Sequence, residues 1–113
     1  MNTRHFKQSE FQCKCCKKSK PCLELMVVLE LVRAHFKKPV IITSGYRCLK
    51  NNKRVGGAPG SKHLKGIAAD IKINGVTPSD IYDFLNDTFP DNFGIGLYSG
   101  WVHIDVRKTK ARW

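Results

Sequence analysis

The chain has 113 residues, of which 42% are hydrophobic, and it carries a formal net charge of +11 at pH 7. This length allows one domain with one modest core and excludes two full-sized domains. The positive charge favours anionic partners, such as nucleic acid, lipid head groups or acidic cell-wall polymers, without choosing among them. The longest apolar stretch, "LELMVVLELV", is interrupted by two glutamates and is too short to span a membrane.

The first residues, "MNTRHFKQSEFQCK", are polar and charged, and they lack the apolar region of a secretory signal. We therefore expect a chain that is made in the cytoplasm without a signal peptide and has no transmembrane segment. If the protein acts outside the cell, another component has to release it.

Five cysteines are present, and four of them fall within ten residues. Because a reducing cytosol disfavours disulfides, Cys13 and Cys16 are interpreted as one C-x-x-C half of a zinc knuckle, to which Cys22 adds a third thiolate. A four-cysteine site would need Cys48 or Cys15. Since a second C-x-x-C half is missing, free thiols in a loop are the competing interpretation.

The first half of the chain predicts a loop, a helix and a strand in that order. Residues 1–20 are basic and cysteine-rich, and they show no period. Pro21 suits the first position of a helix, and apolar residues at helical spacing predict that helix over residues 23–36. The β-branched residues 40–43 predict a buried strand, whereas the glycines and asparagines of residues 51–60 predict a loop.

The second half predicts more strands around one further helix. The pattern of residues 67–73 predicts a strand, and Thr77 or Ser79 is placed to cap a helix that runs to Phe89. The segments "FGIGLYS" and "WVHIDVR" predict two antiparallel strands, and the tail "KTKARW" is expected to fray or to pack on the sheet edge. We expect residues 1–113 to form a single α+β domain, a small antiparallel sheet with helices packed on one face.

Four polar residues stand where apolar residues are expected. His63 precedes the predicted strand and Asp70 lies within it, where an aspartate is costly unless it is paired or bound to a cation. His103 and Asp105 lie two residues apart, on one face of the "WVHIDVR" strand. Two histidines and one carboxylate, with one position left open, are a common ligand set of catalytic zinc.

These residues also have a structural interpretation. A histidine near a strand can be a satisfied structural residue, and Asp70 can form an ion pair with Arg47 or Lys72. A histidine and an aspartate seven positions apart are, moreover, a weaker signal than H-E-x-x-H.

Four blocks of sequence in the range 40–107 carry a resemblance. They are "SGYR", "NNKRVGGA" with its N-x-x-V-G-G-A pattern, "SKHLKGIAAD" with its S-x-H-x-x-G-x-A-x-D pattern, and "WVHIDVR" with a late histidine. In this order they resemble the zinc D-Ala-D-Ala carboxypeptidase family, the VanY-like peptidases that share a fold with the hedgehog signalling domain. The first forty residues carry little of the resemblance.

The resemblance implies a zinc ion held by His63, Asp70 and His103, with water as the fourth ligand. It also implies that Arg47 holds substrate or stabilises an oxyanion, for which a planar guanidinium is suited. Members of the family cut amide bonds in the peptidoglycan stem peptide. Some are carboxypeptidases that act next to D-alanine, and others are phage endolysins that cut between L-Ala and D-Glu.

One position departs from the family pattern. Many members have an acidic residue three positions before the last histidine as general base, and here that position is Gly100. Asp105 is the nearest acid and either activates the water, which is the role we expect, or orients a ligand imidazole. Ser61 and Tyr98 are candidates for substrate contact, although Ser61 can serve only to bond the loop backbone and Tyr98 only to fill the rim.

Three functions follow from these observations. The first is a monomeric zinc peptidase that acts on the peptidoglycan stem peptide, as a phage or prophage lysin whose charge binds anionic cell-envelope polymers. The second is a wall-binding or ligand-binding module of the same fold that has lost catalysis, which the glycine at position 100 favours. The third, a nucleic-acid binder built on the cysteine knuckle, leaves His63, Asp70 and His103 unexplained, so no specific nucleic-acid partner is expected.

Overall fold

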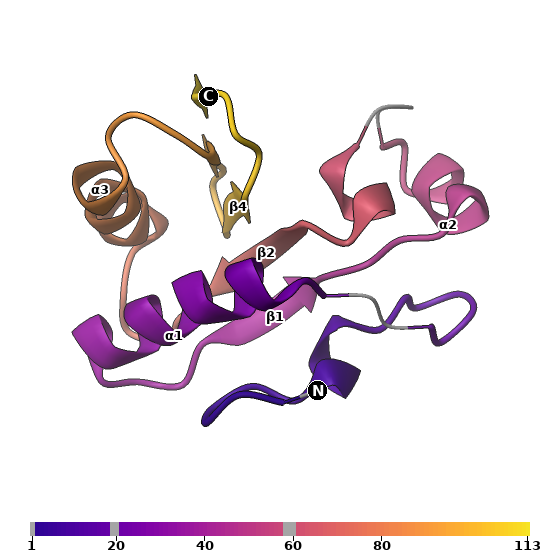
Figure 1. The fold of residues 1–113 in the computed structure, drawn as a ribbon, viewed down its shortest axis with the longest axis horizontal. Helices are drawn as coiled ribbons and strands as arrows, with labels where there is room; N and C mark the ends of the chain where they lie inside the picture. Colours follow the sequence, from indigo (N-terminus) through magenta and orange to yellow (C-terminus); the bar gives the residue numbers. More distant parts are fainter. Residues whose placement is uncertain (1, 19–20, 58–60) are drawn as a thin grey trace.

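A five-stranded mixed sheet organises the chain in the computed structural model, which describes residues 2–18, 21–57 and 61–113 (Figure 1). The strands are β1 (Ile41–Ser44), β2 (Ala68–Lys72), β3 (Gly94–Leu97), β4 (Val102–Asp105) and β5 (Ala111–Arg112). Their order in the sheet is β1-β2-β4-β3-β5, and every neighbouring pair is antiparallel except β3 and β5. The α+β class predicted from the sequence is confirmed.

The sheet differs from the expected antiparallel one in its last strand. The tail pairs at the sheet edge, where β5 hydrogen-bonds to β3. The chain reverses its direction after β4, and β4 is antiparallel to β3. A strand that follows this reversal and lies beside β3 therefore has to run parallel to it.

The helix α1 (Leu23–Phe36) has the bounds predicted from its apolar period. Its N-cap is Cys22, whose sulfur accepts a hydrogen bond from the Leu25 N–H at 3.4 Å. Pro21 was expected at the first helical position, but it lies before the cap. Cys22 is the cap because its sulfur accepts from one of the N–H groups that the first turn of a helix leaves unpaired. The buried stripe of α1 comprises Leu25, Met26, Val28, Leu29 and Val32.

The helix α3 (Pro78–Thr88) begins at the predicted cap, where the Thr77 hydroxyl accepts the Asp80 N–H at 3.1 Å. It buries Ile81 and Leu85. Both α1 and α3 contribute to one apolar core with residues of the sheet. None of the described helices is both long and apolar enough to cross a bilayer.

The predicted loop over residues 51–60 is wrong in part, because Leu49–Arg54 form the helix α2. Asparagine is a weak helix former, but Asn51 and Asn52 are both buried here, and this packing overrides their intrinsic preference. Residues 58–60, which include Ala58 of the N-x-x-V-G-G-A motif, lie outside the described residues.

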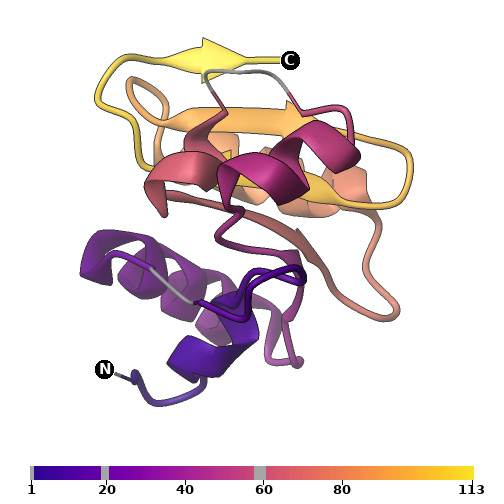
Figure 2. The ribbon, with the colours of Figure 1, turned by 90° about the vertical axis from the view of Figure 1, so that its right-hand side faces the viewer.

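The two faces of the sheet have different characters. Alternation along the central strands turns Ala69 of β2 and Ile104 of β4 toward the apolar core, and these two are directly paired. The next pair along the register, Asp70 with His103, therefore lies on the opposite face. Figure 2 shows α2 and the 3₁₀ turn η2 (Lys62–Lys65) on one side of the sheet and α3 on the other.

Candidate metal centre

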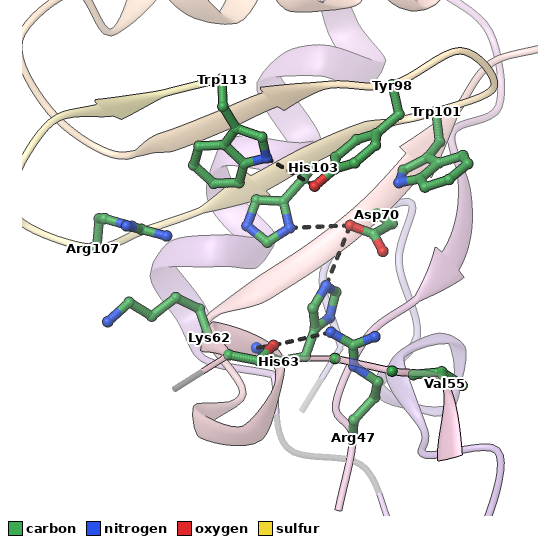
Figure 3. A pocket seen from close by; sticks show the side chains of 13 residues that line it. Arg47, Val55, Lys62, His63, Asp70, Tyr98, Trp101, His103, Arg107 and Trp113 are labelled. Atoms are coloured by element: carbon green, nitrogen blue, oxygen red, sulfur yellow. Dashed lines mark hydrogen bonds and ion pairs between the residues drawn. The ribbon is translucent and has the colours of Figure 1, made fainter. Parts of the chain in front are cut away.

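Three predicted ligands meet on the polar face of the sheet. Asp70 and His103 are cross-strand neighbours in β2 and β4, and His63 reaches them from η2 (Figure 3). The Asp70 Oδ1 atom lies 3.2 Å from His63 Nε2 and 3.1 Å from His103 Nδ1. One ligand atom from each of the three residues lies within 4.8 Å of the others. Zinc bonds of 2.0–2.1 Å in tetrahedral geometry would separate such atoms by about 3.3 Å, so the set fits this ion.

Local structure places His63 toward the strands. The Ser61 hydroxyl caps η2 by accepting the His63 N–H at 3.2 Å. Gly66 then ends the turn with φ +73°, a left-handed conformation that favours glycine. The His63 carbonyl accepts the backbone N–H of Arg47 at 3.1 Å, which links the turn to the segment after β1.

The outer nitrogen of each histidine has its own partner. The Nδ1 of His63 lies 2.6 Å from the carbonyl oxygen of Gly45, and the Nε2 of His103 lies 2.8 Å from Oδ2 of Asp105. Because a carbonyl and a carboxylate only accept, these outer nitrogens carry hydrogen. In the neutral rings, the inner nitrogens then present lone pairs toward the Asp70 carboxylate. Two nitrogen lone pairs and one carboxylate that converge on one point repel each other unless a cation or protons lie between them. This set of donors is typical of a divalent metal site.

The pKa values reflect the same convergence. Burial works against ionisation of Asp70, but when the rings of His103 and His63 donate to its carboxylate, these hydrogen bonds outweigh burial and hold the pKa of Asp70 well below its usual range. Burial also lowers the pKa of His103, whereas Asp105 and Asp70 raise it by more, so the net shift is upward. The raised pKa favours the protonated ring, and a proton on its inner nitrogen competes with a metal ion there.

Asp105 lies behind the predicted ligand His103. It is fully buried, and Arg107 donates to it through Nε at 2.8 Å, Nη2 at 2.7 Å and the backbone N–H at 3.1 Å. With the contact to His103, these bonds engage both carboxylate oxygens. Gly94 leaves the space that this pair occupies, because a Cβ there would lie 2.6 Å from Arg107 Nε. This geometry orients His103 and leaves Asp105 outside the set of residues that line the cavity.

A cavity of about 480 Å³ opens over the three ligands. The guanidinium of Arg47 borders it and donates through Nη2 to Ser61 Oγ at 2.9 Å. Its Nε is buried and has no hydrogen-bond acceptor among the described residues. Lys62 and Arg107 add positive charge to the lining, whereas Asp70 is the sole carboxylate among the described residues that line it. The cavity therefore favours an anionic ligand.

An aromatic wall closes one side of the cavity (Figure 3). The rings of Tyr98 and Trp101 stack with centroids 4.7 Å apart and planes 7° apart. Trp113 donates from Nε1 to the Tyr98 hydroxyl at 2.8 Å, and its ring centroid lies 5.0 Å from that of His103. Gly96 of β3 makes room for this tail residue, since a Cβ there would lie 2.5 Å from Trp113 Cε2.

The structure therefore gathers the predicted site residues with one exception. Around the cavity it places His63, Asp70, His103, Arg47, Ser61 and Tyr98. Asp105 stands behind His103. The sequence interpretation missed Lys62, Trp101, Arg107 and Trp113. For Arg107 and Trp113 the glycines at positions 94 and 96 of β3 were an available signal, because a glycine inside a strand marks a close approach of another group.

The cysteine cluster differs from the predicted one. The sulfurs of Cys13, Cys16 and Cys48 lie within 4.8 Å of one another. Cys22 was expected as the third ligand, but its sulfur is used as the cap of α1. Cys48 takes that place because the fold brings the start of α2 to the N-terminal loop.

A sequence profile of the Peptidase M15 family matches residues 4–105. A comparison with curated protein sequences gives no match. Because the family match covers most of the chain, this protein belongs to the M15 peptidases, which are zinc-dependent metallopeptidases. The His63, Asp70 and His103 set fits the metal that such an enzyme requires.

Proposed function

We propose that this protein hydrolyses an amide bond in the peptidoglycan stem peptide, as a D-Ala-D-Ala carboxypeptidase or an L-Ala-D-Glu endopeptidase. The observation that carries the proposal is the convergence of His63, Asp70 and His103 at the base of an open, cationic cavity. Peptide stems of the cell wall carry carboxylates, so their charge complements this lining. Membership of the M15 family supports the same reaction class.

In the proposed enzyme, His63, Asp70 and His103 hold one zinc ion. When bound, zinc polarises a carbonyl and lowers the pKa of a water ligand to about 7. The two histidines would be neutral ligands, and Asp70 would supply one negative charge. The loaded site would therefore keep a net positive charge toward the carbonyl group of a substrate. The aromatic wall of Tyr98 and Trp101 would lie against the peptide and limit its approach to one side.

Arg47 has the geometry of a substrate clamp. Ser61 fixes one end of its guanidinium by accepting from Nη2, and the guanidinium borders the cavity. A planar guanidinium binds a carboxylate or a developing oxyanion through two parallel hydrogen bonds. We assign to Arg47 the binding of a stem-peptide carboxylate or of the oxyanion, with Ser61 as its support.

Asp105 is assigned a positioning role. Its carboxylate is fully buried and engaged by His103 and Arg107, so it is poorly placed to take a proton from a water in the cavity. A carboxylate on the outer nitrogen of a ligand histidine fixes the tautomer and raises the basicity of the ring. Of the two roles that the sequence allows for Asp105, orientation of the ligand is the one we propose.

The site of action follows from the proposed substrate. We propose that the protein reaches the cell wall after release, as a phage or prophage lysin, and works as a monomer. The net charge of +11 would retain it on anionic envelope polymers.

A second candidate is a wall-binding module without catalysis. Gly100 favours it, because many related enzymes have an acid at that position. The backbone there borders open space, since a Cβ added to Gly100 would meet no atom of the described residues within 4 Å. The missing acid therefore does not reflect crowding. Such a module would bind zinc and peptidoglycan without forming a product.

Digestion of purified peptidoglycan by the zinc-loaded protein, followed by mass spectrometry of the released fragments, tests the proposal. Release of free D-alanine, or of fragments with a new D-Glu amino terminus, identifies the cut bond. His103→Ala provides the control and should release neither. Stoichiometric zinc without any new terminus would favour the binding module.

A further inference from the structure

A second group of metal-binding side chains lies outside the cavity. Cys13 and Cys16 belong to a loop after the 3₁₀ turn η1 (Gln8–Phe11), and Cys48 is the N-cap residue of α2. The sulfurs of Cys13 and Cys48 are 3.7 Å apart, and all three sulfurs lie within 4.8 Å of one another. Three thiols from two distant segments are thus directed at one point.

The sulfur spacing suits a metal ion. Four sulfurs bound at 2.3 Å around tetrahedral zinc lie about 3.8 Å apart, close to the spacing of Cys13 and Cys48. A disulfide would need about 2.05 Å between two sulfurs and would leave the third without a role. The positions therefore match shared coordination better than a covalent pair.

The loop around Cys13 is built to support a thiolate. Its ends are closed by two backbone hydrogen bonds, from Cys13 N–H to the Lys18 carbonyl at 2.6 Å and from Lys17 N–H to the Cys13 carbonyl at 2.9 Å. The Cys48 N–H donates to the Cys13 sulfur at 3.4 Å. Donors fixed around a sulfur stabilise the negative charge that a metal ligand carries.

The two remaining cysteines are occupied elsewhere. Cys22 caps α1 through the Leu25 N–H. Cys15 lies against the guanidinium of Arg54, whose Nη2 is 3.8 Å from its sulfur. These two residues provide matched controls, because they share the chemistry of the cluster without its geometry.

We propose that Cys13, Cys16 and Cys48 bind a second metal ion of the zinc class, separate from the site in the cavity. Cys16 is exposed, so water can complete the four-coordinate shell there. The ion would join the N-terminal loop to the start of α2, which are 35 residues apart at Cys13 and Cys48.

A metal ion bound to the three cysteines would act on the segment that carries Arg47. Cys48 directly follows Arg47, and the preceding Tyr46 donates its backbone N–H to the Phe11 carbonyl at 2.9 Å. The N-terminal segment thus holds both sides of Arg47, and the metal would fix one of them. This consequence rests on the proposed function, whereas the metal site itself does not.

Metal content per chain tests the site directly. The protein is loaded with zinc under reducing conditions, passed through a desalting column and analysed by elemental mass spectrometry. We expect two zinc ions per chain for the parent and for Cys15→Ser and Cys22→Ser, but one for Cys13→Ser, Cys16→Ser and Cys48→Ser. Cys16→Ser alters an exposed side chain, so it keeps the test valid if a variant at the buried Cys13 fails to fold.

Cobalt provides an independent readout that separates the two sites. Sulfur-to-cobalt charge-transfer absorption should appear in the parent and persist in His103→Ala, which removes a ligand of the cavity site alone. It should disappear in Cys48→Ser. A zinc content that Cys13→Ser and Cys48→Ser leave at the parent's level, no sulfur-to-cobalt absorption in the parent, or a reductant-sensitive parent mass lowered by two hydrogens would overturn the proposal. None of these results depends on whether the protein cleaves peptidoglycan.

Discussion

Asp105 holds His103 from behind, with 2.8 Å between Oδ2 and Nε2, and this contact turns the opposite ring nitrogen toward Asp70. The register between β2 and β4 places Asp70 directly across from His103. Asp70, His103 and Asp105 are therefore joined by two successive side-chain contacts, one across the sheet and one along β4. Of the two carboxylates, Asp70 lines the cavity and Asp105 does not.

Asp105→Asn should weaken zinc binding by about 10- to 100-fold, because the amide no longer fixes or polarises the His103 ring. Competition with a chromophoric chelator measures this affinity. Asp91→Asn, a change at an exposed carboxylate, serves as the control and should leave it unchanged. If Asp105→Asn kept full zinc affinity but lost turnover, the residue would be the general base and the positioning role would be wrong.

Zinc affinity should rise with pH through the neutral range. The pKa of His103 is raised above its ordinary value of 6.5 in the metal-free protein. Below pH 6.5 the proton on His103 therefore stabilises the metal-free protein and competes with zinc. This stabilisation is lost as the pH rises through the raised pKa, and zinc binds more tightly. Titrations at several pH values test the sign, and calorimetry in buffers of different ionisation enthalpy should detect proton release. An affinity independent of pH would contradict this assignment.

Arg47→Lys should lower kcat/KM by about 10- to 100-fold, because a lysine cannot form the paired hydrogen bonds of a guanidinium to a charged acceptor. Zinc content should remain that of the parent, since Arg47 is not a ligand. Lys53→Arg, an exposed exchange of the same two residue types on α2, is the control. Unchanged kinetics in Arg47→Lys would show that this side chain does not bind the substrate.

Gly94→Ala should destabilise the fold by about 1–3 kcal/mol, because the added Cβ would overlap the Asp105 and Arg107 pair in a tightly packed strand. Thermal or urea unfolding of the zinc-free protein measures the change. Gly100→Ala meets open space and should unfold like the parent. Equal losses at the two glycines would contradict crowding at Gly94 as the cause of the effect.

Local patterns were sufficient for much of the fold. The apolar period predicted a helix over residues 23–36, although Pro21 was expected at its first position. In the structure the helix ends at the Cys22 cap and at the left-handed Lys37. The alternation along the "WVHIDVR" strand was enough to put His103 and Asp105 on one face. The motif around His63 and Asp70 pointed to the metal ligands by resemblance, and spacing alone would have left an ion pair as an alternative.

What the sequence could not supply were relationships set by tertiary packing. The helix α2 contains two asparagines that favour loops, and it forms because both are buried. Cys48 joins the cysteine cluster through a contact across 35 residues that no local spacing encodes. The function of Asp105 depends on the direction of its carboxylate, and Arg107 fixes that direction. The parallel strand β5, which carries Trp113 into the cavity wall, likewise follows from a chain reversal after β4.

Zinc-dependent cleavage of peptidoglycan is the most direct test of the central claim. The protein is stripped of metal with a chelator, dialysed and assayed on purified peptidoglycan before and after one and two equivalents of zinc are added back, with new amino termini and released D-alanine quantified by mass spectrometry. We predict no cleavage by the stripped protein, recovery with zinc, and no recovery for Asp70→Ala or His63→Ala. Full cleavage by the stripped protein, or by either variant, would contradict the assignment of His63, Asp70 and His103 as the catalytic metal site.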